Sequence, residues 1–186
     1  MKTALVLVDI QNDYFPGGRM ELSGMDAAGE TAKRLLSFFR DTNWPTVHIQ
    51  HISAQKGATF FVPETEGVKI HECITPQDRE TVIQKHYPNS FRETDLYDHL
   101  TGAAVKNVVI CGAMSHMCID ATTRAAADLG FSCVVVHDGC ATRDLEFKGK
   151  KIPATDVHAA FMAALGMAYA RVLGFKEFLS YTDKLK

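Results

Sequence analysis

The sequence predicts an α/β fold in which helices flank a mainly parallel sheet. Apolar runs alternate with amphipathic stretches along the chain, which is the pattern of parallel strands connected by helices. The first apolar run, residues 4–8, contains no polar side chain, as expected of a strand buried on both faces. The chain has 186 residues, 46% of them hydrophobic, which suits one domain with a sizeable core. We therefore expect a single domain over residues 1–186.

Periodicity predicts the elements of the first half after that strand. We expect, in order, a helix at 26–40, strands at 45–49 and 81–83, and a helix at 93–100. The first of these helices ends in an apolar cluster that includes Leu35 and Phe39. Segment 53–76 shows neither period, and long loops of this kind in compact domains are often active-site lids.

The second half continues the alternation of strands and helices. We expect, in order, a strand at 107–111, a helix at 117–129, a strand at 131–136, a helix at 154–170 and an edge strand near 172–173. Gly112 closes the first of these strands, and Gly130 is a usual signal for the end of a helix. Pro153 stands where the last helix opens, a position that proline tolerates.

Composition excludes several classes of protein. The formal net charge is -2, whereas nucleic-acid-binding domains usually carry a basic face. No stretch reaches the roughly 18 apolar residues of a membrane helix. The apolar run near the N-terminus is too short for a signal peptide. We therefore expect a cytoplasmic protein with a small-molecule substrate and with no nucleic-acid or membrane partner.

The five cysteines contain no CxxC pair, so neither a zinc ribbon nor a thioredoxin-like motif is supported. A disulfide framework is not expected in a chain of this length without an export signal. We interpret Cys111, Cys133 and Cys140 as buried structural thiols and assign no role to Cys73. At least one thiol is left over for another purpose, and the composition does not say which.

Three reactive side chains stand where predicted strands end. Asp9 follows the first strand, Lys85 ends the third, and Cys118 follows the fourth at the start of a helix. The carboxyl ends of parallel strands form the ligand-binding edge of an open sheet. There a carboxylate accepts the thiol proton, an ammonium stabilises the thiolate, and helix N–H groups lower the pKa of the thiol and form an oxyanion hole. Taken singly, Asp9 also suits a turn cap, and Lys85 and Cys118 are more often a solvated lysine and a small buried hydrophobe.

Three segments carry a resemblance to a known family. They are Asp9–Tyr14 (DIQNDY), Lys85 with the following Asn89–Phe91 (NSF), and Gly112–Ala126 (GAMSHMCIDATTRAA). In this order, spread over essentially the whole chain, they resemble the isochorismatase-like cysteine hydrolase family, and the third segment is the most specific. The resemblance implies a three-layer α/β/α Rossmann-like fold around a six-stranded sheet.

The same resemblance implies a catalytic triad of Asp9, Lys85 and Cys118 that needs no cofactor. It also implies a cis peptide bond between Ala113 and Met114. Such a bond turns the N–H of Met114 toward the site, where it forms an oxyanion hole with the N–H of Cys118.

Four further side chains are candidates for substrate contact. Relatives place an aromatic pocket wall at the position of Tyr14, Phe60 and Phe61 lie in the long loop, and His116 precedes the nucleophile by two residues. Each has a structural alternative, namely a packed loop tyrosine, a core or dimer contact, and a capping histidine. We interpret His158, in the nearly apolar helix 154–170, as a packing or interface residue, and we expect a homodimer or homotetramer.

The sequence departs from the family at one ligand set. Nicotinamidases of the family carry an Asp-x-His set and a further His after the second strand. Here His48 and His51 occur without the Asp, so we expect no metal and interpret both as strand-end hydrogen-bonders or pocket walls.

These observations favour a hydrolase that cleaves a C–N bond (amide, ureido or lactam-type) of a small molecule through a thioester acyl-enzyme. Isochorismatases proper lack the nucleophilic cysteine, which is present here as Cys118. Two alternatives stay open. One is vinyl-ether hydrolysis of the isochorismatase type with Asp9 as the acid, and the other is a non-catalytic binding protein on the same fold.

Overall fold

A computed structural model describes residues 2–185 and places six strands in one sheet, all of them parallel to their neighbours. The strand order is β3-β2-β1-β4-β5-β8. The strands are β1 (Lys2–Val8), β2 (Thr46–His51), β3 (Thr81–Lys85), β4 (Val105–Ala113), β5 (Ser132–Ala141) and β8 (Ala170–Leu173). The expected α/β class and six-stranded sheet are confirmed.

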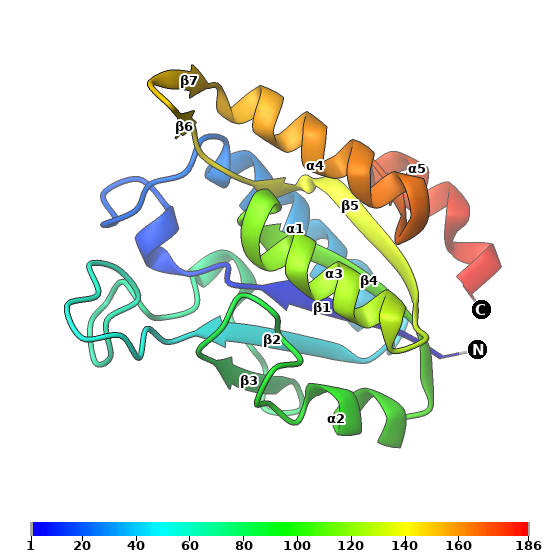
Figure 1. Ribbon diagram of the computed structural model, residues 1–186. Coiled ribbons are helices and arrows are strands. Elements are labelled where there is room, and N and C mark those ends of the chain that lie inside the picture. Colours follow the sequence, from blue (N-terminus) through cyan, green and yellow to red (C-terminus); the bar gives the residue numbers. More distant parts are fainter. Residues whose placement is uncertain (1, 186) are drawn as a thin grey trace.

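Helices cover both faces of this sheet (Figure 1). They are α1 (Met25–Asp41), α2 (Leu96–Gly102), α3 (Asp120–Asp128), α4 (Ala154–Ala168) and α5 (Phe175–Tyr181). Helices α1 and α5 pack together through the rings of Phe38 and Phe178, whose centroids are 5.7 Å apart. Helices α2, α3 and α4 cover the other face, as right-handed crossovers from β3, β4 and β5 require. Among residues 2–185, no helix combines the length and the apolar character that a membrane crossing needs.

Several boundaries differ from the expectation. The helix expected at 93–100 begins only at Leu96, because Glu93 has a left-handed φ of 56° that ends regular helix. The helix expected at 117–129 divides into a π-helical segment, Ser115–Ile119, and α3. Cys118 therefore lies in the π-helical segment and not at the first turn of α3.

Three elements were not expected at all. They are α5 and the two strands of an antiparallel hairpin, β6 (Leu145–Phe147) and β7 (Lys150–Ile152). With seven residues in α5 and three in each hairpin strand, none is long enough to show a clear period.

The strand order reverses between β1 and β4. From β1 the chain proceeds outward to β2 and β3, and then crosses back to β4 on the other side of β1. The connections that leave β1 and β4 therefore run to opposite faces of the sheet and open a crevice at their carboxyl ends. Asp9 follows β1 directly at this crevice, and the π-helical segment follows β4.

Two side chains of the segment after β1 hold the long loop in place. Gln11 donates from Nε2 to the carbonyls of His51 (2.9 Å) and Val68 (2.7 Å), and its Oε1 accepts the N–H of His51 at 2.8 Å. The buried carboxylate of Asp13 accepts the N–H of Phe61 at 2.6 Å. This polar segment is therefore an internal clamp, because its side chains satisfy backbone groups that a buried loop would otherwise leave unpaired.

Gly112, near the end of β4, allows the close approach of β4 to β1. Its φ is 128°, and a Cβ at this position would lie 1.9 Å from the carbonyl oxygen of Val8. Both the conformation and the contact exclude a side chain there.

Gly112→Ala is expected to lower the free energy of unfolding by about 3 kcal/mol or more, because it adds a backbone clash to an unfavourable φ. Urea unfolding followed by circular dichroism measures this change. Gly102→Ala is the matched control, since nothing lies within 4 Å of its added Cβ and its φ is ordinary. Equal stability of the two variants would show that β4 does not approach β1 this closely.

Asp13→Ala leaves the buried N–H of Phe61 without its acceptor. We expect a loss of about 2–4 kcal/mol of unfolding free energy and faster proteolytic cleavage within residues 53–67. Limited proteolysis together with urea unfolding tests both effects. Asp128→Ala, at an exposed carboxylate in the last turn of α3, is the control and should stay within about 0.5 kcal/mol of the parent. If the loop of the Asp13 variant is cleaved no faster than that of the control, the clamp is disproved.

Candidate active site

The structure brings Asp9, Lys85 and Cys118 together at the carboxyl edge of the sheet. Nζ of Lys85 lies 2.9 Å from Oδ2 of Asp9, and it also donates to the carbonyl of Pro88 at 2.9 Å. Ligand atoms of Asp9, His51 and Cys118 all lie within 4.8 Å of one another. The exposed fraction is 0% for Asp9 and Lys85 and 4% for Cys118, so the cluster is almost closed to solvent.

The charge of Lys85 is stabilised inside this cluster. Burial by itself lowers the pKa of the ammonium, but the negative charge of Asp9 and the contact with Cys118 outweigh burial, so the pKa is raised. Lys85 is therefore a permanent cation beside the carboxylate at neutral pH.

The charged form of Cys118, unlike that of Lys85, is not stabilised in the cluster. Burial raises the pKa of its thiol most, the charge of Asp9 raises it further, and Lys85 only partly offsets these two effects. This result differs from the lowered pKa that a helix start led us to expect. The resting thiol therefore keeps its proton at neutral pH, and it can act as a nucleophile only if a base removes that proton.

Asp9 is placed to be that base. The backbone of Asp9 turns sharply after β1, with φ of 53°, and its N–H donates to the carbonyl of Ile49 at 3.1 Å. Neither carboxylate oxygen accepts a hydrogen bond of standard geometry from the described residues, and the contact with Lys85 is an ion pair outside that geometry. Buried carboxylate oxygens normally have hydrogen-bond partners, so Asp9 has unused capacity for a proton.

The peptide bond between Ala113 and Met114 is cis, as the resemblance implied. The carbonyl of Met114 accepts the N–H groups of Met117 (3.0 Å) and Ile119 (3.2 Å). These bonds fold the chain into the π-helical segment that presents Cys118 toward Asp9. The oxyanion role of the Met114 and Cys118 N–H groups stays a prediction.

An aromatic cluster adjoins the three reactive groups. The ring of Tyr14 lies 4.6 Å from that of Phe61 and 6.0 Å from that of Phe60, measured between centroids. Burial raises the pKa of the Tyr14 phenol most, and the neighbouring Cys118 and Asp9 raise it further. The structure thus packs the three aromatic candidates against one another, with the ring of Phe61 5.8 Å from that of His51. Phe61 is fully buried in the core, in agreement with its structural alternative.

Two of the histidines named in the sequence analysis, His116 and His158, have structural partners. Nδ1 of His116 lies 2.6 Å from Oγ1 of Thr142, in agreement with the capping alternative. Nδ1 of His158 lies 2.9 Å from Oγ of Ser115, so α4 supports the π-helical segment from outside. His158 is a packing residue, as expected.

His51, which the sequence analysis interprets as a strand-end hydrogen-bonder or pocket wall, lies beside the carboxylate of Asp9. It ends β2, pairs in register with Lys85, and places Nδ1 3.9 Å from Oδ2 of Asp9. Burial lowers the pKa of His51 more than Asp9 raises it, so the imidazole is neutral at pH 7. The predicted strand 45–49 ended two residues before His51, whereas β2 extends to it, and the sequence did not predict its contact with Asp9.

Asp9, His51 and Cys118 also form a group with the donor atoms of a metal site. The ammonium of Lys85, however, already lies 2.9 Å from the carboxylate oxygen. A divalent cation would have to share this oxygen with a fixed positive charge, and Coulomb repulsion in a buried site opposes that arrangement. The group is therefore better suited to proton exchange than to metal binding. His48 instead contacts Glu80, with Nε2 3.0 Å from Oε2, and is a buried hydrogen-bonder as expected.

Comparisons with known proteins agree with this geometry. The family model of the isochorismatase domain matches residues 3–164. The chain is 53% identical over 179 residues to the uncharacterized isochorismatase family protein YddQ of Bacillus subtilis (strain 168), and the match covers 96% of this chain and 99% of that protein. A crystal structure of a protein from Oleispira antarctica matches with a TM-score of 0.92 and 50% identity, over 96% of each chain.

A more distant relative has a named activity. Maleamate amidohydrolase of Pseudomonas putida is 30% identical over 151 residues, which cover 74% of this chain and 71% of that protein. The family match extends over most of the chain and includes the three segments on which the resemblance rested. The chain therefore belongs to the isochorismatase family.

Proposed function

We propose that the protein hydrolyses a C–N bond of a small molecule, with Cys118 as the nucleophile. The observation that carries this proposal is the buried cluster of thiol, carboxylate and ammonium at the point where the strand order reverses. The similarity to a maleamate amidohydrolase supports the amide class of substrate. The reaction needs no redox step and no electron acceptor.

The first half of the proposed reaction forms a thioester. Asp9 takes the proton from Sγ of Cys118 as the sulfur attacks the carbonyl carbon of the substrate. The N–H groups of Met114 and Cys118 stabilise the oxyanion that develops. The C–N bond then breaks, and the proton held by Asp9 passes to the departing nitrogen, which leaves as ammonia or an amine.

The second half returns the enzyme to its resting state. Asp9 takes a proton from a water molecule, whose oxygen attacks the thioester carbonyl, and the C–S bond breaks. The product acid leaves, and the sulfur of Cys118 recovers the proton from Asp9. Lys85 stays charged throughout and stabilises each negative charge that appears on the two groups beside it.

The aromatic cluster suggests which part of a substrate it contacts. Tyr14, Phe60 and Phe61 offer a largely apolar wall beside the sulfur. Such a wall suits a flat or apolar portion next to the scissile carbonyl. The bond of His116 to Thr142 favours a capping role for that residue over a direct contact with the substrate.

Two alternatives predict different behaviour. A vinyl-ether hydrolase that used Asp9 as its acid would not need the sulfur and would resist iodoacetamide. A binding protein on this fold would turn over no amide. The approach of Asp9 to the thiol favours cysteine chemistry over both, because it supplies the base that a protonated thiol requires.

The homodimer or homotetramer stays a prediction, with α4 as its contact. The outward side of α4 exposes small and apolar residues, among them Ala159, Ala163 and Met167, the last of which is 87% exposed. Exposed apolar surface of this kind is typical of subunit contacts.

Cys118→Ala is expected to lower kcat/KM by about 1000-fold or more, because it removes the atom that forms the covalent intermediate. The substrate is first found by screening small amides, ureido acids and lactams for release of ammonia or amine. Cys73→Ala is the control and should keep full activity, since Cys73 lies in the loop away from the cluster. Iodoacetamide should inactivate the parent enzyme. Full turnover by the Cys118 variant on an accepted substrate would rule out the thioester mechanism.

Charge changes beside the thiol should shift its titration in opposite directions. Asp9→Asn removes a negative charge and should lower the pKa of Cys118, whereas Lys85→Met removes a positive charge and should raise it. The pH dependence of thiolate absorbance, taken as the difference from the matching Cys118→Ala variant, measures both shifts. Identical titrations in all three proteins would mean that the groups are not electrostatically coupled.

A further inference from the structure

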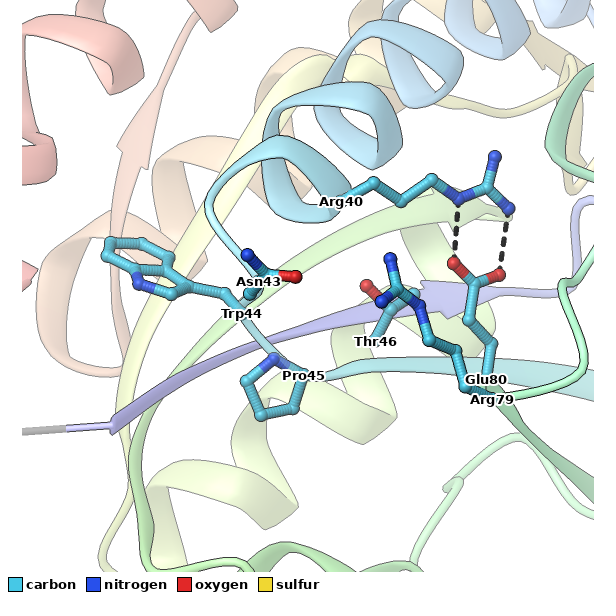
Figure 2. A pocket seen from close by; sticks show the side chains of 7 residues that line it. All are labelled: Arg40, Asn43, Trp44, Pro45, Thr46, Arg79 and Glu80. Atoms are coloured by element: carbon cyan, nitrogen blue, oxygen red, sulfur yellow. Dashed lines mark hydrogen bonds and ion pairs between the residues drawn. The ribbon is translucent and has the colours of Figure 1, made fainter.

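A cavity of about 210 Å³ lies at the end of the sheet opposite the candidate active site (Figure 2). It is bounded by the end of α1, the first residue of β2 and the residues just before β3. The residues that line it are Arg40, Asn43, Trp44, Pro45, Thr46, Arg79 and Glu80. None of them belongs to the reactive cluster, so the cavity is a separate feature of the molecule.

Glu80, the acidic residue of the cavity, already has hydrogen-bond partners on both carboxylate oxygens. Arg40 donates to both carboxylate oxygens of Glu80, from Nε at 2.7 Å and from Nη2 at 2.8 Å (Figure 2). Glu80 Oε2 also accepts the N–H of Gln77 at 3.0 Å and contacts His48. Although burial opposes ionisation of Glu80, these bonds lower its pKa to about 2. Glu80 therefore has no remaining capacity for a ligand cation, and its charge is cancelled by Arg40.

Two hydrogen-bond donors of the cavity, in contrast to Glu80, have no partner. Within residues 2–185, the exposed guanidinium of Arg79 has no ion pair and no hydrogen bond, and the side-chain amide of Asn43 has no hydrogen bond. Figure 2 shows the guanidinium of Arg79 directed toward the side of the cavity that Thr46 lines. The cavity thus holds one uncompensated positive charge and several donors without acceptors.

Thr46 adds an independent observation. Its side chain is 8% exposed, and its buried Oγ1 has no hydrogen-bond partner among the described residues. A buried hydroxyl without a partner costs about 1–3 kcal/mol, and proteins rarely leave such a group unsatisfied. Because this oxygen has almost no accessible surface, a ligand oxygen supplies the missing partner once the Thr46 side chain turns toward the cavity.

We propose that this cavity binds a small oxyanion, with a phosphate group as the best match and a carboxylate as the second source of the same chemistry. Arg79 supplies the charge, and Thr46 and Asn43 supply neutral hydrogen bonds. Guanidinium groups recognise oxyanions through several N–H donors at once. The cavity volume of about 210 Å³ accommodates a group of about five heavy atoms.

The single tryptophan of the chain, Trp44, lines the cavity and reports on it directly. Its fluorescence is titrated with sodium phosphate, sodium acetate and sodium chloride at constant pH and ionic strength, and calorimetry repeats each titration. Phosphate should give a saturable change and chloride none. Saturation by acetate alone would support the site and identify a carboxylate as its ligand.

Two variants test the assigned contacts. Arg79→Gln should weaken phosphate binding about tenfold or more, since it removes the free charge. Thr46→Val, which keeps the shape of the side chain, should weaken it about threefold. Arg79 is exposed, so its replacement should not disturb folding.

Lys106→Gln is the matched control, because it removes the same charge from an exposed side chain at the amino end of β4 and outside the cavity. It should bind phosphate as the parent does. The proposal is overturned if neither phosphate nor acetate gives a saturable signal by either method. It is also overturned if Arg79→Gln binds as tightly as the Lys106 control.

Discussion

The buried ion pair between Asp9 and Lys85 is the interaction on which the rest of the site depends. Removing two charges from water costs several kcal/mol for each ion, and their attraction offsets this cost only with good geometry and further partners. Lys85 has such a partner in the carbonyl of Pro88, whereas Asp9 has none of standard geometry. The carboxylate thus depends on Lys85 as its charged partner, and Sγ of Cys118 lies within 4.8 Å of it.

Asp9 follows β1 and Lys85 ends β3, and these two strands are not neighbours in the sheet. Strand β2 lies between them, so Lys85 must reach past the end of β2 to meet Asp9. His51, in register with Lys85, occupies that end, and Gln11 fixes its backbone from both sides. The polar segment after β1 is thus as important to the site as the reactive side chains, since it sets where β2 stops.

The sequence alone predicted those features of the fold and the site that one local pattern determines. The unbroken apolar run at 4–8 identified the central strand, and the strand-end rule brought Asp9, Lys85 and Cys118 to one edge. It did not predict the features that depend on contacts between distant parts of the chain. The hydrogen bond that Asp13 accepts from Phe61 joins residues far apart in the chain, and no periodic pattern in the sequence predicts it. The pKa of Cys118 was expected to fall because a helix start is visible in sequence, whereas the burial that raises it is not.

Burial of Cys118 is nevertheless compatible with its role as the proposed nucleophile. The proposed reaction starts from a carboxylate, an ammonium and a neutral thiol, so the net charge of the cluster is zero. After the proton moves from sulfur to Asp9, the thiolate is negative, the acid is neutral and the net charge is unchanged. Loss of the same proton to bulk water would instead leave a second anion in a closed, low-dielectric site, and burial raises the pKa of the thiol against that process. The enclosure therefore opposes ionisation toward solvent without opposing transfer inside the cluster. It keeps the thiol protonated in the resting state and, in the proposed reaction, lets Asp9 create the thiolate where a substrate carbonyl can receive it.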